Sequence, residues 1–222
     1  MNLTLFDLDG TLIPVDSDHA FGGFMVEVGW VDGTAWGARN DEFFAQYNAG
    51  TLNLAEYIDF ATSAWRARPL DEALAMRERF MDEVMRPALR PEAVALIERH
   101  RAAGDLMAIV TATNVFVTTP IAQAFGVEHL IAVDLKRDAA GRYSGEIDGI
   151  PSFREGKIAR VEHWLRGQGA QWHDFERVTF YSDSTNDLPL LERVSHPVAT
   201  NPSPSLAAVA SARGWPQLHL FA

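Results

Sequence analysis

The feature that most constrains the fold is an alternation of short apolar runs with helix-like segments, interrupted once near the N-terminus. Residues 3–6 form an apolar run that leads into two aspartates, which predicts a short buried strand ending at Asp7. From about Phe21 to Arg86, apolar residues recur at helical spacing and the breaks fall at glycines and prolines. This stretch predicts three or four helices and no strand.

After Pro87 the chain alternates regularly between strand and helix patterns. Strands are expected over Leu106–Thr111, His129–Leu135 and Val178–Ser182, over Pro197–Thr200 and near Leu218. Helices are expected over Pro91–Ala103 and Gly156–Gly167. Another should follow the Leu106–Thr111 strand and end at Phe125, and two more should begin at about Asn186 and at Pro204. The alternating residues of Arg142–Gly149 predict a small exposed hairpin.

Strands that alternate with helices form a parallel sheet covered on both faces, so the predicted fold class is α/β, with a Rossmann-like parallel sheet as its core. The helical block separates the first strand from the others. The predicted core is therefore discontinuous, comprising residues 1–13 and 88–222, and residues 14–87 form a helical cap. Hinges between the two are expected near 13–15 and 86–89, where Pro14 and Pro87 flank the insert.

Composition excludes several classes of protein and site. With no cysteine among 222 residues, disulfides, zinc–thiolate sites, iron–sulfur clusters and cysteine nucleophiles are impossible. The net charge of −11 and the lack of a basic block disfavour nucleic-acid and polybasic membrane partners. No apolar stretch approaches a membrane span and the N-terminus does not resemble a signal peptide, so a cytoplasmic protein is expected. The oligomeric state cannot be predicted.

Polar residues gather where the predicted strands end, which is the edge at which open α/β sheets bind ligands. Asp7 and Asp9 follow the first strand, and Asp183 and Asp187 follow another. Several carboxylates without cysteine or a histidine cluster favour Mg²⁺ over Zn²⁺. Lys157 and the hydroxyl of a strand-end threonine suit phosphate oxygens, and together these groups indicate phosphoryl transfer.

Four segments in this order resemble the four motifs of the haloacid dehalogenase superfamily. They are Phe6–Leu12 (FDLDGTL), the strand ending in Thr111, Lys157, and Ser182–Asp187 (SDSTND). The helical insert directly after the first motif resembles the cap of phosphoserine phosphatases and their relatives. Ser182 and Ser184 stand where glycines are common in the family.

The resemblance implies roles for the two aspartates of the first motif. Asp7 would be the nucleophile that attacks phosphorus, and Asp9 would protonate the leaving alcohol and then activate water. The second aspartate is typical of phosphatases and phosphomutases, so dehalogenation is disfavoured.

The resemblance also implies a phosphate site and a Mg²⁺ site. The phosphate site would comprise Gly10, Thr111, Lys157 and Asn186, with Lys157 also counted as catalytic. The metal site would comprise Asp7, the backbone carbonyl of Asp9, Asp183 and Asp187, the last orienting water ligands. Helix capping is the simpler alternative for Thr111, Asn186 and Asp187.

The substrate is expected to be set by the cap, which carries a net charge of −7 against −4 for the remaining residues. Asp16 stands where phosphoserine phosphatases place a glutamate that meets the substrate amine, and Asp18 and His19 follow it. Ala61 stands where they place an arginine for the substrate carboxylate. The expected substrate is therefore a small cationic phosphomonoester such as L-histidinol phosphate, on which some similar family members act.

Cap aromatics could stack on such an imidazole; the candidates are Trp36, Phe43, Phe44, Tyr47 and Trp65. Several alternatives stay open at this point. The acidic surface and the aromatics could serve solubility and cap packing alone. The substrate could be phosphoserine or another small phosphomonoester, the enzyme could pass phosphate to an acceptor alcohol, or the chain could bind a phosphometabolite without catalysis.

Overall fold

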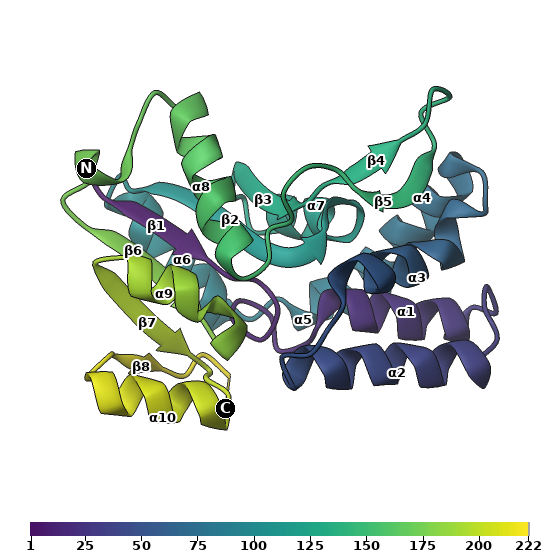
Figure 1. Cartoon of the computed structure of the whole chain (residues 1–222), viewed down its shortest axis with the longest axis horizontal. Helices are drawn as coiled ribbons and strands as arrows, with labels where there is room; N and C mark the ends of the chain where they lie inside the picture. The colour runs from purple at the N-terminus through teal and green to yellow at the C-terminus, as the bar shows by residue number, and fades with distance from the viewer. Residues whose placement is uncertain (222) are drawn as a thin grey trace.

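The computed structural model describes residues 1–221, and its centre is a six-stranded parallel sheet. The strands are β1 (Leu3–Phe6), β2 (Leu106–Asn114), β3 (His129–Val133), β6 (Val178–Ser182), β7 (His196–Thr200) and β8 (Gln217–Leu218). Their order is β3-β2-β1-β6-β7-β8, so the first strand in sequence is central (Figure 1). The predicted α/β class with a parallel sheet is confirmed.

Helices cover both faces of the sheet, as the strand sequences require. They are α6 (Pro91–Ala102), α7 (Val115–Ala124), α8 (Glu155–Gly167), α9 (Leu188–Arg193) and α10 (Pro204–Arg213). Successive side chains of a strand point to opposite faces. Phe6 and Ile109 belong to the apolar cluster that contains α6 and α7, whereas Leu5 and Val110 belong to the cluster that contains α8, α9 and α10.

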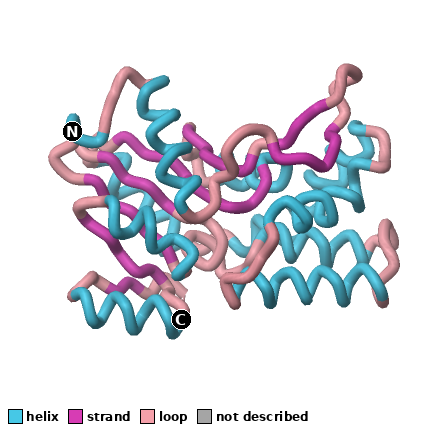
Figure 2. The backbone as a smooth tube through the Cα atoms, viewed as in Figure 1, coloured by secondary structure: helices cyan, strands magenta, loops and turns pink. Residues whose placement is uncertain are grey.

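The segment between β1 and α6 contains helices joined by turns and no strand, as predicted. It contains α1 (Ser17–Glu27), α2 (Ala35–Asn48), α3 (Leu54–Arg66), α4 (Leu70–Phe80), a π-helical turn (Met81–Met85) and α5 (Arg86–Ala88). Side-chain caps start two of these helices, since Asp16 accepts from His19 N–H and Asn53 from Glu56 N–H. The helices lie beyond the carboxyl ends of the central strands, beside the sheet rather than on its faces (Figures 1 and 2).

The region after β3 differs from the prediction. The expected strand over His129–Leu135 ends at Val133, because Asp134 turns aside to pair with Arg160 on α8. Leu135 instead begins β4 (Leu135–Arg137), which pairs antiparallel with β5 (Tyr143–Ile147). The predicted hairpin over Arg142–Gly149 is thus the second half of a larger one.

Most residues of this hairpin are exposed, as predicted, but Tyr143 packs onto the helical segment. Its ring meets Trp65 of α3 edge-on, with 5.1 Å between ring centroids. Trp65 in turn stacks on Phe116 of α7 at 3.9 Å. The hairpin and α7 therefore hold α3 from the side of the sheet.

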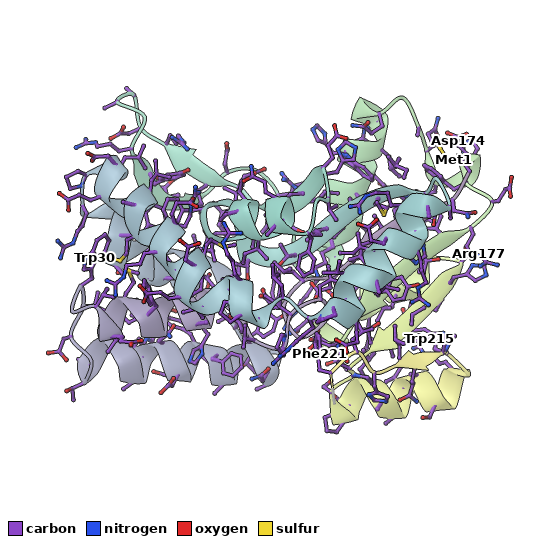
Figure 3. All side chains as sticks on the ribbon, turned by 180° about the vertical axis from the view of Figure 1, so that it is seen from behind. Met1, Trp30, Asp174, Arg177, Trp215 and Phe221 are labelled. Carbon is purple, nitrogen blue, oxygen red and sulfur yellow. The ribbon has the colours of Figure 1, made fainter. Side chains whose placement is uncertain are left out.

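The two ends of the molecule are far apart along its long axis. Seen from behind, Trp30 lies at the outer end of the helical segment, and Arg177 and Trp215 lie at the opposite end (Figure 3). Within residues 1–221, no helix has the length and apolar character needed to cross a membrane.

Candidate active site

The carboxyl ends of β1, β2 and β6 bring most of the predicted site residues together. Asp7 directly follows β1, and its N–H donates to the Tyr181 carbonyl of β6 at 2.9 Å. Asp7, Lys157 and Asp187 are 4%, 1% and 2% exposed. Ionised groups are rarely this deeply buried unless they are paired, so the partners of each group determine its charge state.

Lys157 is the cation that joins two of these carboxylates. It stands in the first turn of α8, and its Nζ lies 2.8 Å from Asp7 Oδ1 and 2.7 Å from Asp187 Oδ1. Burial alone would lower the pKa of Lys157, but Asp187 and Asp7 together raise it above its usual value. The amine therefore stays charged beside Asp7.

Asp183 lies next to Asp7 on the other side. Thr11 Oγ1 is 3.3 Å from both Asp7 Oδ2 and Asp183 Oδ1. Gly10 has a φ of +72°, and a Cβ at this position would lie 2.4 Å from Asp183 Oδ2. Only glycine combines this backbone conformation with so close an approach of the carboxylate.

Asp9 is held by a different set of partners. Its Oδ1 accepts from Ser17 N–H at 2.8 Å, and its Oδ2 accepts from the Thr113 hydroxyl at 2.7 Å. Burial, and then the charge of Asp16, raise the pKa of Asp9 to about 7. The two carboxylates of the first motif thus differ in their hydrogen-bond partners, which are Lys157 for Asp7 and Ser17 with Thr113 for Asp9.

The remaining charges leave this edge with an excess of negative groups. Burial raises the pKa of Asp7 to about 7 even though Lys157 opposes the shift. Burial and the charges of Asp7 and Asp187 hold the pKa of Asp183 well above its usual value. Such carboxylates stay ionised together only when a further cation lies between them.

The donor set fits a hard divalent cation. Within residues 1–221, no three Asp, Glu, His or Cys side chains form a metal cage by themselves. Asp7 and Asp183 are the two carboxylates that converge, so a metal here would complete its shell with backbone carbonyl and water oxygens. Mg²⁺ is typically bound through one or two carboxylates in this way.

A pocket opens from these groups toward the helical segment. Its lining includes Asp7, Asp9 and Thr111 on the sheet side, and its cavity volume is about 20 Å³. The helical segment contributes Asp16, Phe43, Phe44, Tyr47, Leu52, Leu54 and Tyr57. No lysine or arginine lines it in the described chain. The pocket is therefore aromatic and acidic.

Comparison with known proteins agrees with this geometry. Residues 4–192 match the family model described as haloacid dehalogenase-like hydrolase. The chain belongs to this family. The expectation of an enzyme is confirmed with it, since the chain is a hydrolase of the phosphatase type.

Individual relatives place the chain within the family. It is 38% identical to a histidinol-phosphatase of Neisseria meningitidis serogroup C, with 98% of both chains covered. A solved protein of unknown function from Bordetella pertussis Tohama I is 49% identical, with a TM-score of 0.93 and 99% of both chains covered. A substrate-bound phosphoserine phosphatase has a TM-score of 0.67 over 97% of this chain and 91% of its own, at 17% identity, which shows a shared fold.

Some residues predicted from the haloacid dehalogenase resemblance have other partners than expected. Asp187 accepts from Lys157 and from Ser182 Oγ at 2.8 Å, so Ser182, where glycine is common in the family, adds a bond. The Asn186 amide donates to the Tyr47 carbonyl at 3.1 Å, and Asn186 does not line the pocket. Thr111 Oγ1 accepts from Thr113 N–H at 3.1 Å and does line it.

The three predicted specificity residues separate in space. Asp16 lines the pocket. Asp18 lies behind it, 5% exposed, with both carboxylate oxygens 3.1 Å from Asn114 Nδ2. His19 turns outward, where Nε2 meets Asp41 Oδ1 at 2.8 Å and its ring stacks on Phe44. Of the three, the structure brings Asp16 to the pocket, while Asp16 and His19 both line an outer groove that reaches Asp9 and Asp183.

Sequence reasoning missed Thr113, Asn114 and Tyr57. Thr113 holds Asp9, Asn114 holds Asp18, and Tyr57 lines the pocket. A signal for the first two exists in the polar run Thr111–Asn114, because β2 continues to Asn114, which then caps α7. No local pattern distinguishes Tyr57 from the aromatics that pack inside the helical segment.

Proposed function

We propose that the protein is a Mg²⁺-dependent phosphomonoester phosphatase that forms an aspartyl-phosphate on Asp7. Its preferred substrate is a small cationic metabolite such as L-histidinol phosphate. Residues 14–87 act as the cap over a core of residues 1–13 and 88–222. The observation that carries the proposal is the buried pair of Asp7 and Lys157, with Asp9 held separately by Ser17 and Thr113.

The chemistry follows from the partners of the two aspartates. An Asp7 carboxylate oxygen attacks phosphorus, the bond from phosphorus to the alcohol oxygen breaks, and Asp9 gives its proton to that oxygen. Water then gives a proton to Asp9 and attacks phosphorus, the bond from phosphorus to the Asp7 oxygen breaks, and phosphate leaves with Asp7 restored. A pKa of about 7 suits Asp9 to both transfers near neutral pH.

Charge on the phosphoryl group is balanced by residues already in place. Lys157 keeps its proton and lies against Asp7, where phosphoryl oxygens would gather. Thr111 offers a hydroxyl at the same edge. Mg²⁺ held by Asp7, Asp183 and the Asp9 carbonyl would supply further charge neutralisation.

The pocket favours a cationic substrate over an amino acid phosphate. Asp16 offers a carboxylate, and Phe43, Phe44, Tyr47 and Tyr57 offer aromatic faces for an amine or imidazolium. A substrate carboxylate would find no arginine or lysine among the lining residues of the described chain. The relative named histidinol-phosphatase, alike over nearly its full length, supports the same substrate.

The test is phosphate release from a panel of phosphomonoesters with Mg²⁺, run beside Asp7→Asn. The panel contains histidinol phosphate, phosphoserine, phosphoethanolamine and an aryl phosphate. We expect the highest kcat/KM for histidinol phosphate, and a loss of at least about a thousandfold in Asp7→Asn. Faster release from phosphoserine would contradict the substrate, and activity that survives Asp7→Asn would contradict the nucleophile. Added alcohols show whether phosphate passes to acceptors other than water.

A further inference from the structure

The C-terminal end of α2 is bonded to two side chains from distant parts of the chain. The guanidinium of Arg154 donates to the Gly50 carbonyl, and Asn186 Nδ2 donates to the Tyr47 carbonyl at 3.1 Å. Arg154 Nη2 also lies 3.5 Å from Asn186 Oδ1, which joins the two donors. Carbonyls at a helix end carry partial negative charge, so a cation and an amide suit them, and the Tyr47 carbonyl also accepts from Gly50 N–H at 3.0 Å. This end of α2 faces the sheet (Figure 1).

Arg154 reaches this contact from an unusual backbone conformation. Its φ is +50° and its ψ is −124°, values that side-chain-bearing residues rarely adopt. The guanidinium lies over the Phe153 ring at 4.8 Å, and that ring lies 6.3 Å from the ring of Tyr47. Strain of this kind persists where the surroundings hold it, and it gathers at functional sites. The mechanism above gives Arg154 no role.

The contact lies between the pocket wall and the phosphate site. On one side, Tyr47 and Leu52 line the pocket at either end of the α2–α3 connection. Tyr47 also lines an outer groove that reaches Asp9, Gly10 and Asp183. On the other side, Arg154 precedes Lys157 by three residues, and Asn186 precedes Asp187. Movement of residues 48–53 away from the sheet would break the bond from Arg154 to the Gly50 carbonyl.

We propose that Arg154 is a positioning residue that latches residues 48–53, the last residue of α2 and its connection to α3, against the sheet, and that Asn186 holds the adjoining Tyr47. The latch keeps Tyr47 and Leu52 over the substrate, and its release opens the path by which substrate enters and product leaves. The effect of the latch on substrate entry and product release rests on the proposed function, whereas its effect on the mobility of residues 48–53 does not.

The structural consequence is tested by hydrogen–deuterium exchange on the intact protein. Arg154→Gln removes the charge from the latch, and we expect amides of residues 48–53 to exchange about tenfold faster. Arg166→Gln is the matched control, because Arg166 is an exposed arginine in the last turn of α8, at the opposite end of the helix from Arg154. Arg154→Gly serves if the glutamine variant folds poorly, since glycine accepts the backbone conformation. Exchange equal to that of the wild type in a folded variant overturns the latch.

The kinetic consequence is tested with the aryl phosphate and histidinol phosphate. Loss of one charged hydrogen bond predicts a KM about tenfold higher in Arg154→Gln, with kcat unchanged or higher, and partial rescue by Arg154→Lys. A lower kcat at unchanged KM would overturn the proposal, because Arg154 would then act on the chemistry. If the wild type releases no phosphate from any ester, the proposed function fails, while hydrogen exchange still decides the latch.

Discussion

At the scale of single residues, Asp18 is a buried carboxylate whose polar partners are neutral. Burial, and then the charge of Asp9, raise its pKa to about 7. Unfolded aspartate loses its proton near pH 4, so between about pH 4 and 7 the folded state binds one proton more than the unfolded state. Stability therefore falls as pH rises through this window, and the full cost is present above pH 7.

Replacing Asp18 with asparagine should remove this cost. The amide keeps an oxygen for Asn114 Nδ2, so we expect Asp18→Asn to be more stable than the wild type at pH 8, by on the order of 1–3 kcal/mol. The gain should vanish near pH 4. Urea unfolding at several pH values, with a chelator present, measures it. Asp148→Asn, an exposed aspartate, is the control, and an equal gain at all pH values would contradict the prediction.

The second prediction at this scale concerns Thr113, whose hydroxyl donates a hydrogen bond to one carboxylate oxygen of Asp9. Thr113→Val keeps the shape of the side chain and removes the donor. General acid catalysis needs an oriented acid, so kcat should fall about tenfold to a hundredfold while KM changes little. Thr113→Ser should recover most of the loss. Steady-state kinetics decide the matter, and an unchanged kcat in Thr113→Val would show that Ser17 alone orients Asp9.

Sequence could predict the residues that carry chemistry but not the direction in which their neighbours face. Asp7, Lys157 and Asp183 come together because each follows a strand or starts a helix at the same sheet edge. Asp18 and His19 are adjacent in α1, yet one turns inward to Asn114 and the other outward to Asp41. That choice depends on contacts between residues that are distant in sequence.

At the scale of secondary structure elements, local sequence patterns again predicted what depends on neighbouring residues and missed what depends on contacts between distant ones. Apolar runs predicted most of the parallel strands near their observed positions, because a strand buried on both faces needs such a run. The hairpin predicted over Arg142–Gly149 is mostly exposed, as its alternating residues indicate. What its own residues do not indicate is the contact of Tyr143 with Trp65, which lies 78 residues earlier.

Tyr143 should therefore stabilise two elements at once. Tyr143→Ala removes an aromatic contact with Trp65 and Phe116, so we expect the free energy of unfolding to fall by about 1–2 kcal/mol. Hydrogen exchange should quicken in both α3 and the hairpin. Tyr143→Phe keeps the ring and should resemble the wild type. Exchange that quickens in the hairpin alone would show that α3 does not depend on this contact.

At the scale of the whole molecule, the helical segment is tied to the sheet at more places than its two chain crossings. Trp65 stacks on Phe116, and Arg77 donates to the Phe116 carbonyl at 3.2 Å. A swing of the entire segment about hinges near 13–15 and 86–89 would separate these contacts. Release of residues 48–53 alone breaks fewer, so it is the smaller motion that could admit substrate.

The uneven charge of the whole molecule leads to the last prediction. The carboxylates that follow β1 and β6 repel one another. A bound Mg²⁺ would reduce this repulsion, and it would do so only in the folded state, where the carboxylates lie together. At a hundredfold excess over the dissociation constant, binding adds about 2.7 kcal/mol, or roughly 5–10 °C in melting temperature for a chain of this length. Asp183→Asn should melt higher than the wild type without Mg²⁺ and gain little from it, whereas Asp148→Asn should respond as the wild type does. Equal Mg²⁺ shifts in all three proteins, measured by calorimetry, would place the cation elsewhere.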